Sequence, residues 1–452
     1  MPKPKKIAVV GAGWAGTASA LFMHNQGHRV TVFESARLLG GRARGVLDDT
    51  FGMIDNGQHL MLGAYQETLK LIAQLNPGIP EKQLLTREPL YLISASGDMH
   101  LKATQFLPAP LNTLIGLMTA TGISWPDKFS MVRLMAGLIM SKPTHPHATQ
   151  DITVLNWLRE KKQSALVIQK IWQPLCLAML NTPVEAACAQ LFQNVLRDSL
   201  GSSMAGATDL VLPRTDLSTL APQRLVGLLD CRLGHTVREI ACLGHGIEID
   251  GEPFDGCIIA APPYNTLRLV KDSLKQTTTH ATLVHQLSQF TYAPITTCYM
   301  RLSQPFDLPA PMLMLNELPN MGHIGQWVFQ RQSQADDGMR NPSCDLAVII
   351  SDSSGLLKES DALAQALHQQ IATQLMQRQD YANHPLPGLQ AFRVITEKRA
   401  TFVAQPGLKR PSNFTDDARL MLAGDWTDTG YPAVIEGAVR SGLKAARGLF
   451  SF

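Results

Sequence analysis

Three glycines between residues 11 and 16 have the spacing of a turn that binds a diphosphate. The run reads Gly11-Ala12-Gly13-Trp14-Ala15-Gly16 and follows an apolar stretch at 6–10. In such a turn Gly11 permits the sharp bend, Gly13 lets the backbone approach the ligand, and Gly16 lets helix and strand pack closely. The free N–H groups at the start of the next helix, around Trp14 and Ala15, would bind the diphosphate. The pattern predicts a dinucleotide site.

An acidic residue stands where the adenosine ribose of a bound dinucleotide would need one. Glu34 follows Gly16 by 18 residues and ends an expected strand at 29–34. Its carboxylate could accept hydrogen bonds from the ribose hydroxyls. An expected helix at 16–26 joins the strands at 6–10 and 29–34 into a βαβ unit. The N-terminal segment therefore predicts a Rossmann-type fold.

A second glycine pair favours FAD over a nicotinamide cofactor. Gly40 and Gly41 follow Glu34 closely and permit another close backbone approach, and Arg42 beside them could neutralise diphosphate charge.

The C-terminal block completes this pattern. Gly424 and Asp425 follow an expected strand at 419–423, and Asp425 could accept hydrogen bonds from the ribityl or phosphate side of the cofactor. The last helix, expected at 433–450, would direct its N-terminus near Val434 toward the pyrimidine side of a flavin, where the helix dipole favours negative charge. The ordered set at both ends of the chain predicts FAD.

Composition excludes several classes of protein. The chain has 452 residues, of which 45% are apolar and 17% charged, with a net charge of +3. These values exclude disordered, coiled-coil and collagen-like chains, and they give no reason to expect a nucleic-acid partner. Seven spread cysteines without a C-x-x-C pair indicate free thiols in a reducing cytoplasm. His145 and His147 form only an isolated pair, so no metal site is expected.

Two apolar stretches, 106–123 and 131–140, are too interrupted to predict a spanning helix. They could lie against the cytoplasmic face of a membrane or cover an apolar cavity, and ordinary buried helices are the alternative.

The quoted motifs resemble those of the FAD-dependent amine oxidase and phytoene desaturase superfamily, in order over most of the chain. The resemblance implies that the C-terminal motif binds flavin. It also implies that a middle strand, expected here at 236–243, contacts the adenine through its backbone at Val237.

Three further blocks resemble the hydroxysqualene dehydroxylases, also called squalene-associated FAD-dependent desaturases. The first block, 55–65, contains Asn56 and Gly57, which are expected to contact the cofactor. The other two blocks are 180–183 with 192–200, and 212–218. The stretches 150–151 and 331–345 match nothing familiar.

This second resemblance implies reductive removal of an allylic hydroxyl from hydroxysqualene, giving squalene for hopanoid biosynthesis. An acid would help the hydroxyl leave as water, and reduced flavin would deliver hydride to the allylic cation. Such a site should be dry and long, and the apolar stretches at 106–140 and 171–180 could line it. Plain core packing is the alternative for them.

Four residues are candidates for the catalytic acid: Asp55, His59, Asp198 and Tyr431. His59 could titrate near neutral pH, or it could merely hold its loop. Asp198 beside Arg197 could instead form a structural ion pair, and Asp55 could anchor the loop beside the flavin.

We expect an α/β, amine-oxidase-like fold with two lobes. Residues 1–95, 205–265 and 395–452 would form a discontinuous Rossmann-type FAD-binding domain. Residues 96–204 and 266–394 would form a mixed α+β substrate-binding domain with an apolar helical cover. No second dinucleotide motif is present, so the reducing electrons would come from an external donor.

Two other functions remain open at this stage. The first is the opposite reaction, carried out by a carotenoid-type desaturase or an amine oxidase. An amine oxidase should have an aromatic cage beside the flavin, and the C-terminal block offers only Trp426 and Tyr431. The second is a carrier of prenyl groups without flavin, which should lack the glycine motifs that this chain keeps.

Overall fold

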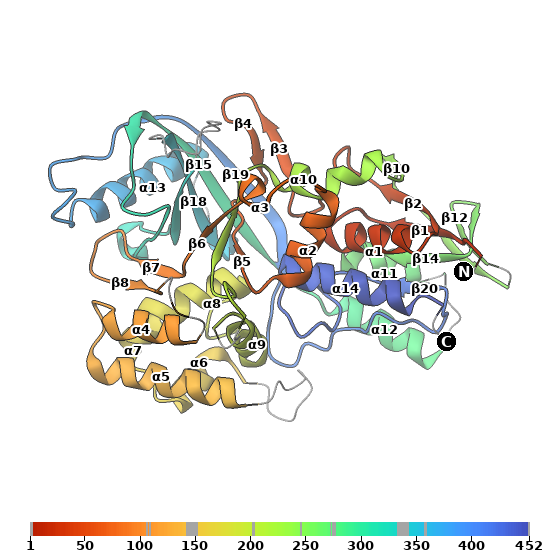
Figure 1. Ribbon diagram of the computed structural model, residues 1–452, viewed down its shortest axis with the longest axis horizontal. Helices are drawn as coiled ribbons and strands as arrows, with labels where there is room; N and C mark the ends of the chain where they lie inside the picture. The colour runs from red at the N-terminus through yellow and green to blue at the C-terminus, as the bar shows by residue number, and fades with distance from the viewer. Residues whose placement is uncertain are drawn as a thin grey trace.

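One parallel and one antiparallel sheet organise the computed structural model of this chain (Figure 1). The structure describes residues 3–104, 107, 110–141, 152–200, 204–244, 246–271, 273, 277–331, 343–356 and 359–450. His145 and His147 lie outside these ranges, as do parts of the apolar stretch 106–123.

The parallel sheet combines strands from the beginning, middle and end of the chain. Its order is β10-β2-β1-β14-β20, and all its neighbours pair in parallel. The three inner strands are short and almost wholly buried, which suits a sheet covered on both faces. The bounds are β1 Lys6–Val10, β2 Arg29–Glu34, β10 Asp230–Leu233, β14 Gly256–Ile259 and β20 Leu420–Leu422.

Two helices from opposite ends of the chain pack against each other on this sheet. They are α1 (Trp14–Asn25) and α14 (Ile435–Gly448). A Cβ atom at Gly442 would lie 2.1 Å from the carbonyl oxygen of Ala15, so the helices approach as closely as they do because Gly442 has no side chain. The Ser19 hydroxyl donates to the Gly442 carbonyl at 3.0 Å. The two ends of the chain therefore lie at the same side of the molecule (Figure 1).

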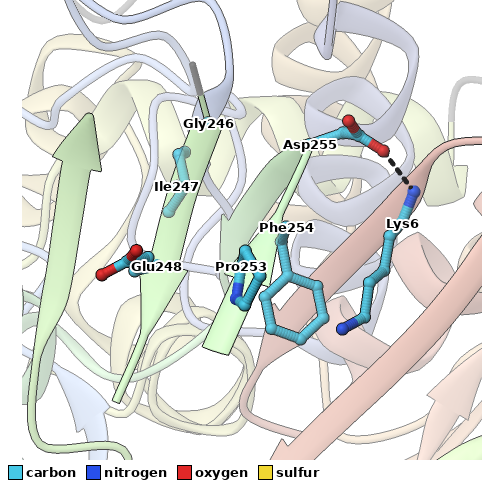
Figure 2. A pocket seen from close by; sticks show the side chains of 7 residues that line it. All are labelled: Lys6, Gly246, Ile247, Glu248, Pro253, Phe254 and Asp255. Carbon is cyan, nitrogen blue, oxygen red and sulfur yellow. Dashed lines mark hydrogen bonds between the residues drawn. The ribbon is translucent and has the colours of Figure 1, made fainter. Parts of the chain in front are cut away.

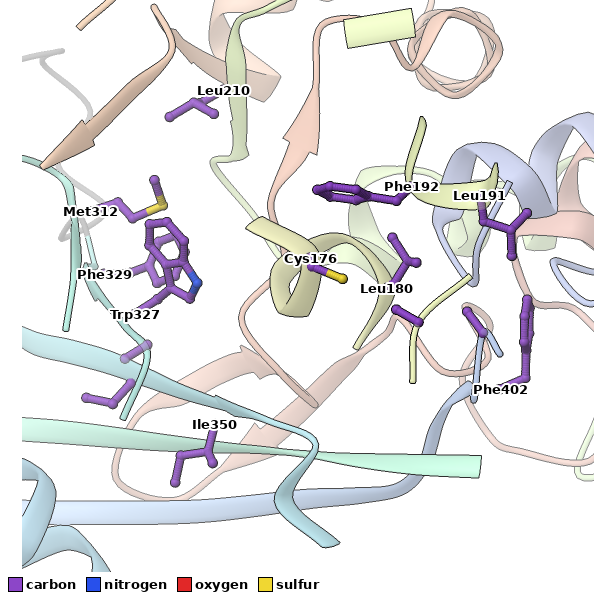
Figure 3. Packing of buried hydrophobic residues seen from close by; sticks show 14 of the residues in the cluster. Cys176, Leu180, Leu191, Phe192, Leu210, Met312, Trp327, Phe329, Ile350 and Phe402 are labelled. Carbon is purple, nitrogen blue, oxygen red and sulfur yellow. The ribbon is translucent and has the colours of Figure 1, made fainter. Parts of the chain in front are cut away.

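The antiparallel sheet has the order β16-β17-β18-β15-β19 and carries the largest cluster of buried apolar side chains. Helix α13 packs on its edge strand β19. The bounds are β15 Tyr292–Phe306, β16 Met312–Met314, β17 Trp327–Gln330, β18 Ser343–Ser351, α13 Ser360–Leu375 and β19 Leu389–Phe402. Figure 3 shows part of this cluster, with Trp327, Phe329 and Met312 gathered together.

A group of helices from residues 111 to 200 lies below this second sheet in Figure 1. They are α4 Leu111–Thr119, α5 Trp125–Met140, α6 Val154–Glu160, α7 Ala165–Val167, a π-helical turn Ile168–Trp172, α8 Gln173–Leu180 and α9 Ala189–Leu200. None of the helices in the described ranges has both the length and the hydropathy needed to cross a bilayer.

Smaller elements connect these parts. The short strands are β3 Gly45–Asp48, β4 Gly52–Asp55, β5 Met61–Leu62, β6 Leu85–Glu88, β7 Tyr91–Ile93, β8 His100–Lys102, β9 Leu210–Pro213, β11 Ile240–Leu243, β12 Gly246–Ile249 and β13 Glu252–Phe254. The remaining helices are α2 Gln66–Leu75, α3 Glu81–Leu84, α10 Leu217–Leu220, a 3₁₀ helix Pro222–Gly227, α11 Pro263–Val270 and α12 Thr278–Ser288, and short 3₁₀ turns lie at Pro319–Met321 and Ser353–Gly355.

The fold class expected from the sequence is confirmed, and most expected elements are found. The strands at 6–10 and 29–34 have the predicted bounds. The strand expected at 236–243 is wrong in its first half, because β11 begins only at Ile240. The parallel sheet takes its strands from the three segments assigned to the FAD-binding domain, whose boundaries remain a prediction.

Candidate active site

The glycine turn after β1 has the shape that its spacing predicts. Gly11 has a φ of +103°, and a Cβ atom on Gly16 would lie 1.9 Å from the Gly11 carbonyl oxygen. A Cβ atom on Gly13 would meet only the Cα of Gly41, at 3.8 Å. The backbone beside Gly13 is therefore open, and it precedes the N-terminus of α1, where Trp14 and Ala15 begin the helix.

The second glycine turn lies against the first. The N–H of Gly40 donates to the carbonyl of Ala12 at 2.9 Å, and Gly40 forms an isolated parallel β-bridge with Gly13. Gly40 and Gly41 both have positive φ angles, of +121° and +64°, which favour glycine. The two turns thus bring backbone from separate motifs together without side chains between them.

Glu34 ends β2 beneath these turns. Its carboxylate accepts hydrogen bonds from the N–H of Ala12 at 2.8 Å and from the N–H of Ala36 at 2.9 Å. The side chain is buried, and these two bonds hold it in one position. A fixed carboxylate at the end of the second strand suits the ribose-binding role predicted for it.

Arg42 and Asp425 come from opposite ends of the chain and form an ion pair. Arg42 Nη2 lies 2.5 Å from Asp425 Oδ1, and Arg42 Nη1 donates to the Ala400 carbonyl at 3.1 Å. Burial opposes the charge of Arg42, but the Asp425 carboxylate more than offsets this effect and raises the Arg42 pKa. The pair places one cation and one carboxylate beside the glycine turns.

The sequence analysis missed Arg410, which supports the same region. This buried side chain donates to the backbone carbonyl of Asp425 at 3.2 Å and to that of Tyr431 at 2.6 Å. Burial lowers its pKa, and the carboxylates of Asp428 and Asp425 oppose that shift. No local motif marks Arg410, because its role depends on contacts with residues further along the chain.

Gly424 lies just after β20, and Val434 lies at the N-terminus of α14. Gly424 has a φ of +155°, and a Cβ atom there would lie 2.2 Å from the Trp426 ring nitrogen. Val434 caps the N-terminus of α14 with extended backbone, so the last helix begins one residue later. Trp426 is fully buried, and its ring nitrogen donates to the Ala261 carbonyl at 3.0 Å. It therefore belongs to the core and does not form the wall of an aromatic cage.

Val237 is the one expected cofactor contact whose local structure differs from the prediction. It lies in the turn before β11, not in a strand, and its carbonyl accepts a hydrogen bond from Arg268 Nη2 at 2.7 Å. One strand that pairs with β2 is β10, which ends at Leu233, shortly before Val237. The sequence analysis missed this strand. An open hollow of about 590 Å³ adjoins this turn and is lined by Gly234, His235, Thr236, Arg238, Glu239 and Asp250.

A second hollow, of about 210 Å³, lies at the opposite end of the parallel strands (Figure 2). It is lined in part by Lys6, where β1 begins, and by Phe254 and Asp255. Ligands of open α/β sheets bind beyond the carboxyl ends of the strands. The glycine turns lie at that end, so the hollow in Figure 2 is not a candidate for the cofactor.

The block at 55–59 lies against the antiparallel sheet. The backbone carbonyl of Asp55 accepts a hydrogen bond from the Tyr299 hydroxyl at 2.9 Å, and the Asn56 N–H donates to the Arg44 carbonyl at 2.9 Å. A Cβ atom on Gly57 would lie 3.5 Å from the Thr297 hydroxyl oxygen. The block thus follows β15 from Tyr299 to Thr297.

Asp55 and His59 differ in their protonation. Burial raises the pKa of Asp55 to about 7, with the hydrogen bond from the Leu217 N–H opposing this shift. Burial lowers the pKa of His59 to about 4, so its imidazole is neutral at neutral pH. His59 Nδ1 is buried and has no hydrogen-bond partner among the described residues. Asp55 is therefore the better proton donor of the two.

The other two candidate acids contact each other. The Tyr431 hydroxyl donates to the Asp198 carboxylate, and the Arg440 guanidinium lies 4.7 Å from the centre of the Tyr431 ring. Burial raises the pKa of Asp198, against the opposing charges of Arg440 and Arg197. The expected ion pair between Asp198 and Arg197 is wrong, because Arg197 donates instead to Asn194, Ser141 and the Leu138 carbonyl.

The residues present fit FAD. The glycine turns leave backbone open beside Gly13, where a Cβ atom would meet only the Cα of Gly41 at 3.8 Å. Glu34, Arg42, Asp425 and the N-termini of α1 and α14 would hold the cofactor. These assignments of individual residues remain predictions.

Comparisons with known proteins place the chain among flavoproteins. Residues 14–449 match the family model described as flavin containing amine oxidoreductase. The hydroxysqualene dehydroxylase of Rhodopseudomonas palustris is 27% identical, covering 98% of this chain and 97% of that protein. The one from Zymomonas mobilis is 25% identical over 97% of both. The 15-cis-phytoene desaturase of Solanum lycopersicum is 22% identical over 99% of this chain and 78% of its own length.

Solved structures support the same fold. Cyclohexylamine oxidase from Brevibacterium oxydans superposes with a TM-score of 0.69 at 16% identity, over 99% of this chain and 98% of its own. A putrescine oxidase bound to putrescine gives a TM-score of 0.66 at 16% identity, over 99% of both chains. Likeness at this level of identity concerns the fold alone.

Proposed function

The chain belongs to the flavin containing amine oxidoreductase family and is an FAD-dependent oxidoreductase, and from that premise we propose that it reduces hydroxysqualene to squalene. Full-length similarity to hydroxysqualene dehydroxylases at 25–27% identity supports this substrate. The observation that carries the proposal within the site is Asp55. Its carboxyl accepts a hydrogen bond from the Leu217 N–H at 2.8 Å, and its pKa of about 7 leaves much of it protonated at neutral pH.

The reaction needs a proton, a hydride and a dry site. Asp55 gives its proton to the allylic hydroxyl, the C–O bond breaks, and water leaves with the bonding electron pair. Reduced FAD held by Glu34, Arg42 and Asp425 would supply the hydride that forms the new C–H bond at the allylic carbon. The two electrons would come from an external donor, either a redox protein or a reduced nicotinamide.

The buried apolar cluster suits a hydrocarbon substrate. Cys176 and Leu180 of α8 lie in the same cluster as Trp327 and Phe329 of β17 (Figure 3). We propose that these surroundings exclude water, which would otherwise trap the cation. Their contact with substrate is a proposal, because the same side chains also serve as core.

We further propose that α4 and α5 rest on the surface of a membrane. Their outward faces present exposed apolar side chains with one cation, Arg133, among them, and they include Leu111, Ile115, Trp125, Phe129 and Met140. An apolar face with an aromatic residue at its end and positive charge suits the interface of an anionic bilayer. A lipophilic substrate would enter from that bilayer.

A second candidate is desaturation of an isoprenoid hydrocarbon, which runs in the oxidative direction. The similarity to 15-cis-phytoene desaturases over 99% of this chain favours it. A chain with this activity would need no proton donor at Asp55.

An anaerobic assay separates the two candidates. The purified yellow protein is incubated with chemically reduced FAD and hydroxysqualene, and the products are analysed by mass spectrometry. We expect squalene, formed in proportion to the reduced cofactor consumed. Absence of squalene, together with desaturation of phytoene under air, would replace the proposed function with the second candidate.

A further inference from the structure

Two strands of the antiparallel sheet, on either side of β18, carry buried polar groups that no described residue satisfies. The ring nitrogen of Trp327 on β17 and the hydroxyl of Thr297 on β15 have no hydrogen-bond partner among the described residues. Trp327 is 5% exposed and Thr297 1%. Buried polar groups normally find partners, so two such groups in one sheet indicate a ligand that supplies them.

The sheet register places these two groups in one row. Thr297 and Trp327 both pair with Ile349 of β18, which lies between them. Residues paired directly across an antiparallel sheet project from the same face. Because neighbouring strands lie about 4.8 Å apart, the backbones of Thr297 and Trp327 are about 10 Å apart, with an apolar side chain between them.

This row borders the expected flavin segment. The Thr297 hydroxyl oxygen would lie 3.5 Å from a Cβ atom on Gly57. Two residues along β15, Tyr299 projects from the same face and bonds the Asp55 backbone. The rest of the row is apolar, with Met314 beyond Trp327 and Ile395 beyond Thr297. The face therefore offers polar contacts at two positions on an apolar background.

The chemistry of the two groups limits the ligand. An indole N–H only donates, whereas a threonine hydroxyl donates and accepts. A group bound by both must therefore carry a lone pair. A hydroxyl oxygen has two, and a protonated amine has none. The row fits a neutral oxygen on a hydrocarbon and does not fit an ammonium group.

We propose that Trp327 and Thr297 bind the hydroxyl group of an otherwise apolar substrate over Ile349, directly or through one water. This inference rests on the proposed function and deepens it, because it assigns the residues that distinguish the alcohol substrate from the hydrocarbon product. The same row excludes protonated amines. His59 lies at the Gly57 end of the row, with its Cε1 3.9 Å from the Cβ position of Gly57.

Binding to the oxidised, FAD-loaded protein tests this role without turnover, since no reductant is present. The dissociation constants of hydroxysqualene and squalene are measured by calorimetry for wild type, Trp327→Phe, Thr297→Val and Thr297→Ser. We expect Trp327→Phe and Thr297→Val each to weaken hydroxysqualene binding about fivefold to tenfold, the effect of one lost hydrogen bond. Squalene binding should stay unchanged, and Thr297→Ser should retain the wild-type preference.

Two matched variants control for general damage. Trp172→Phe removes an indole N–H that is bonded to Gln163, and Thr296→Val removes a hydroxyl bonded to Ser353 and Thr396. Both should leave the ratio of the two dissociation constants at its wild-type value, and the flavin absorption spectrum confirms that each variant is folded and loaded.

A second pair of ligands separates this inference from the proposed function. If wild type ignores hydroxysqualene but binds geranylgeraniol with the same dependence on Trp327 and Thr297, the hydroxyl-binding row stands and the proposed substrate is wrong. If the variants lose equal affinity for the alcohol and the hydrocarbon, or lose none, Trp327 and Thr297 do not bind the hydroxyl group. This conclusion would hold even if wild type makes squalene. Tighter binding of dodecylamine than of dodecanol would also overturn it.

Discussion

The cofactor half and the substrate half of this molecule differ in how the side chains at their expected ligand contacts are bonded. In the cofactor half, the Glu34 carboxylate accepts hydrogen bonds from the Ala12 and Ala36 N–H groups. In the substrate half, the polar atoms of Thr297 and Trp327 have no partner among the described residues.

The difference follows from what each half must bind. A cofactor that stays in place through every turnover can be held by side chains that the backbone fixes, such as Glu34. The substrate must enter and leave, so polar groups that recognise it are left without internal partners. Protein bonds to these groups would compete with the substrate.

The largest expected effect comes from closing the backbone gap in the cofactor half. Gly13→Val puts a branched side chain where the structure leaves only the Cα of Gly41 nearby. We expect loss of bound flavin, measured by absorbance after gel filtration, with unchanged far-ultraviolet circular dichroism. Gly137→Ala is the control, because nothing lies within 4 Å of its Cβ position. A yellow Gly13→Val protein would contradict the assignment.

The next effect concerns Asp55, at the border between the halves. Asp55→Asn removes the proposed acid, so kcat should fall about 10²-fold to 10⁴-fold while flavin is retained. In wild type the rate should fall as pH rises through about 7, because only the protonated carboxyl donates. An unchanged rate in Asp55→Asn would exclude it as the acid.

The same shift has a consequence for stability. Because the pKa of Asp55 is raised in the folded state, the folded protein binds its proton more tightly than the unfolded chain does. This contribution is fully present below about pH 4 and is lost as pH rises through about 7. Asp55→Asn should remove this part of the pH dependence, measured by urea denaturation at pH 5 and pH 8.

A moderate effect is expected at the ion pair between the chain ends. Asp425→Asn leaves the Arg42 cation without its carboxylate, so flavin affinity should fall about tenfold or more and the Tm should drop. Arg42→Gln combined with Asp425→Asn should recover part of the Tm but not the affinity. Additive losses in both measurements would mean that the two residues do not act as a pair.

The smallest effect is expected on the outer face of α5. Trp125 and Phe129 are 58% and 62% exposed, and changing both to Ser should lower the bound fraction in flotation with anionic vesicles severalfold. Activity in detergent should stay unchanged. Met376→Ser is the control, because Met376 is equally exposed beyond the end of α13. Equal binding of both variants would remove the proposed membrane contact.

How much the sequence predicts depends on how local each feature is. The strands β1 and β2 and the position of Glu34 follow from apolar runs and glycine spacing, because each involves neighbouring residues. The edge strand β10 was missed, since its residues Asp230–Leu233 lack a continuous apolar run and pair only with β2. The strand expected at 236–243 begins only at Ile240, so Val237 lies outside it.

The candidate site shows the same limit. The contact between Asp198 and Tyr431 joins α9 to the segment before the last helix. An ion pair of Asp198 with Arg197 was expected only because the two residues are adjacent in sequence. Likewise Trp327 and Thr297 share a row through strand register, which no spacing in the sequence reveals. The sequence shows the type of each residue directly, but it does not show which residues become neighbours across strands.

The close packing of α1 on α14 through Gly442 has a consequence for biosynthesis. The glycine turn at residues 11–16 and helix α1 are synthesised long before α14 and the edge strand β20. The N-terminal βαβ unit therefore lacks the packing of α14 until that helix has been synthesised, and its apolar face stays exposed during this interval.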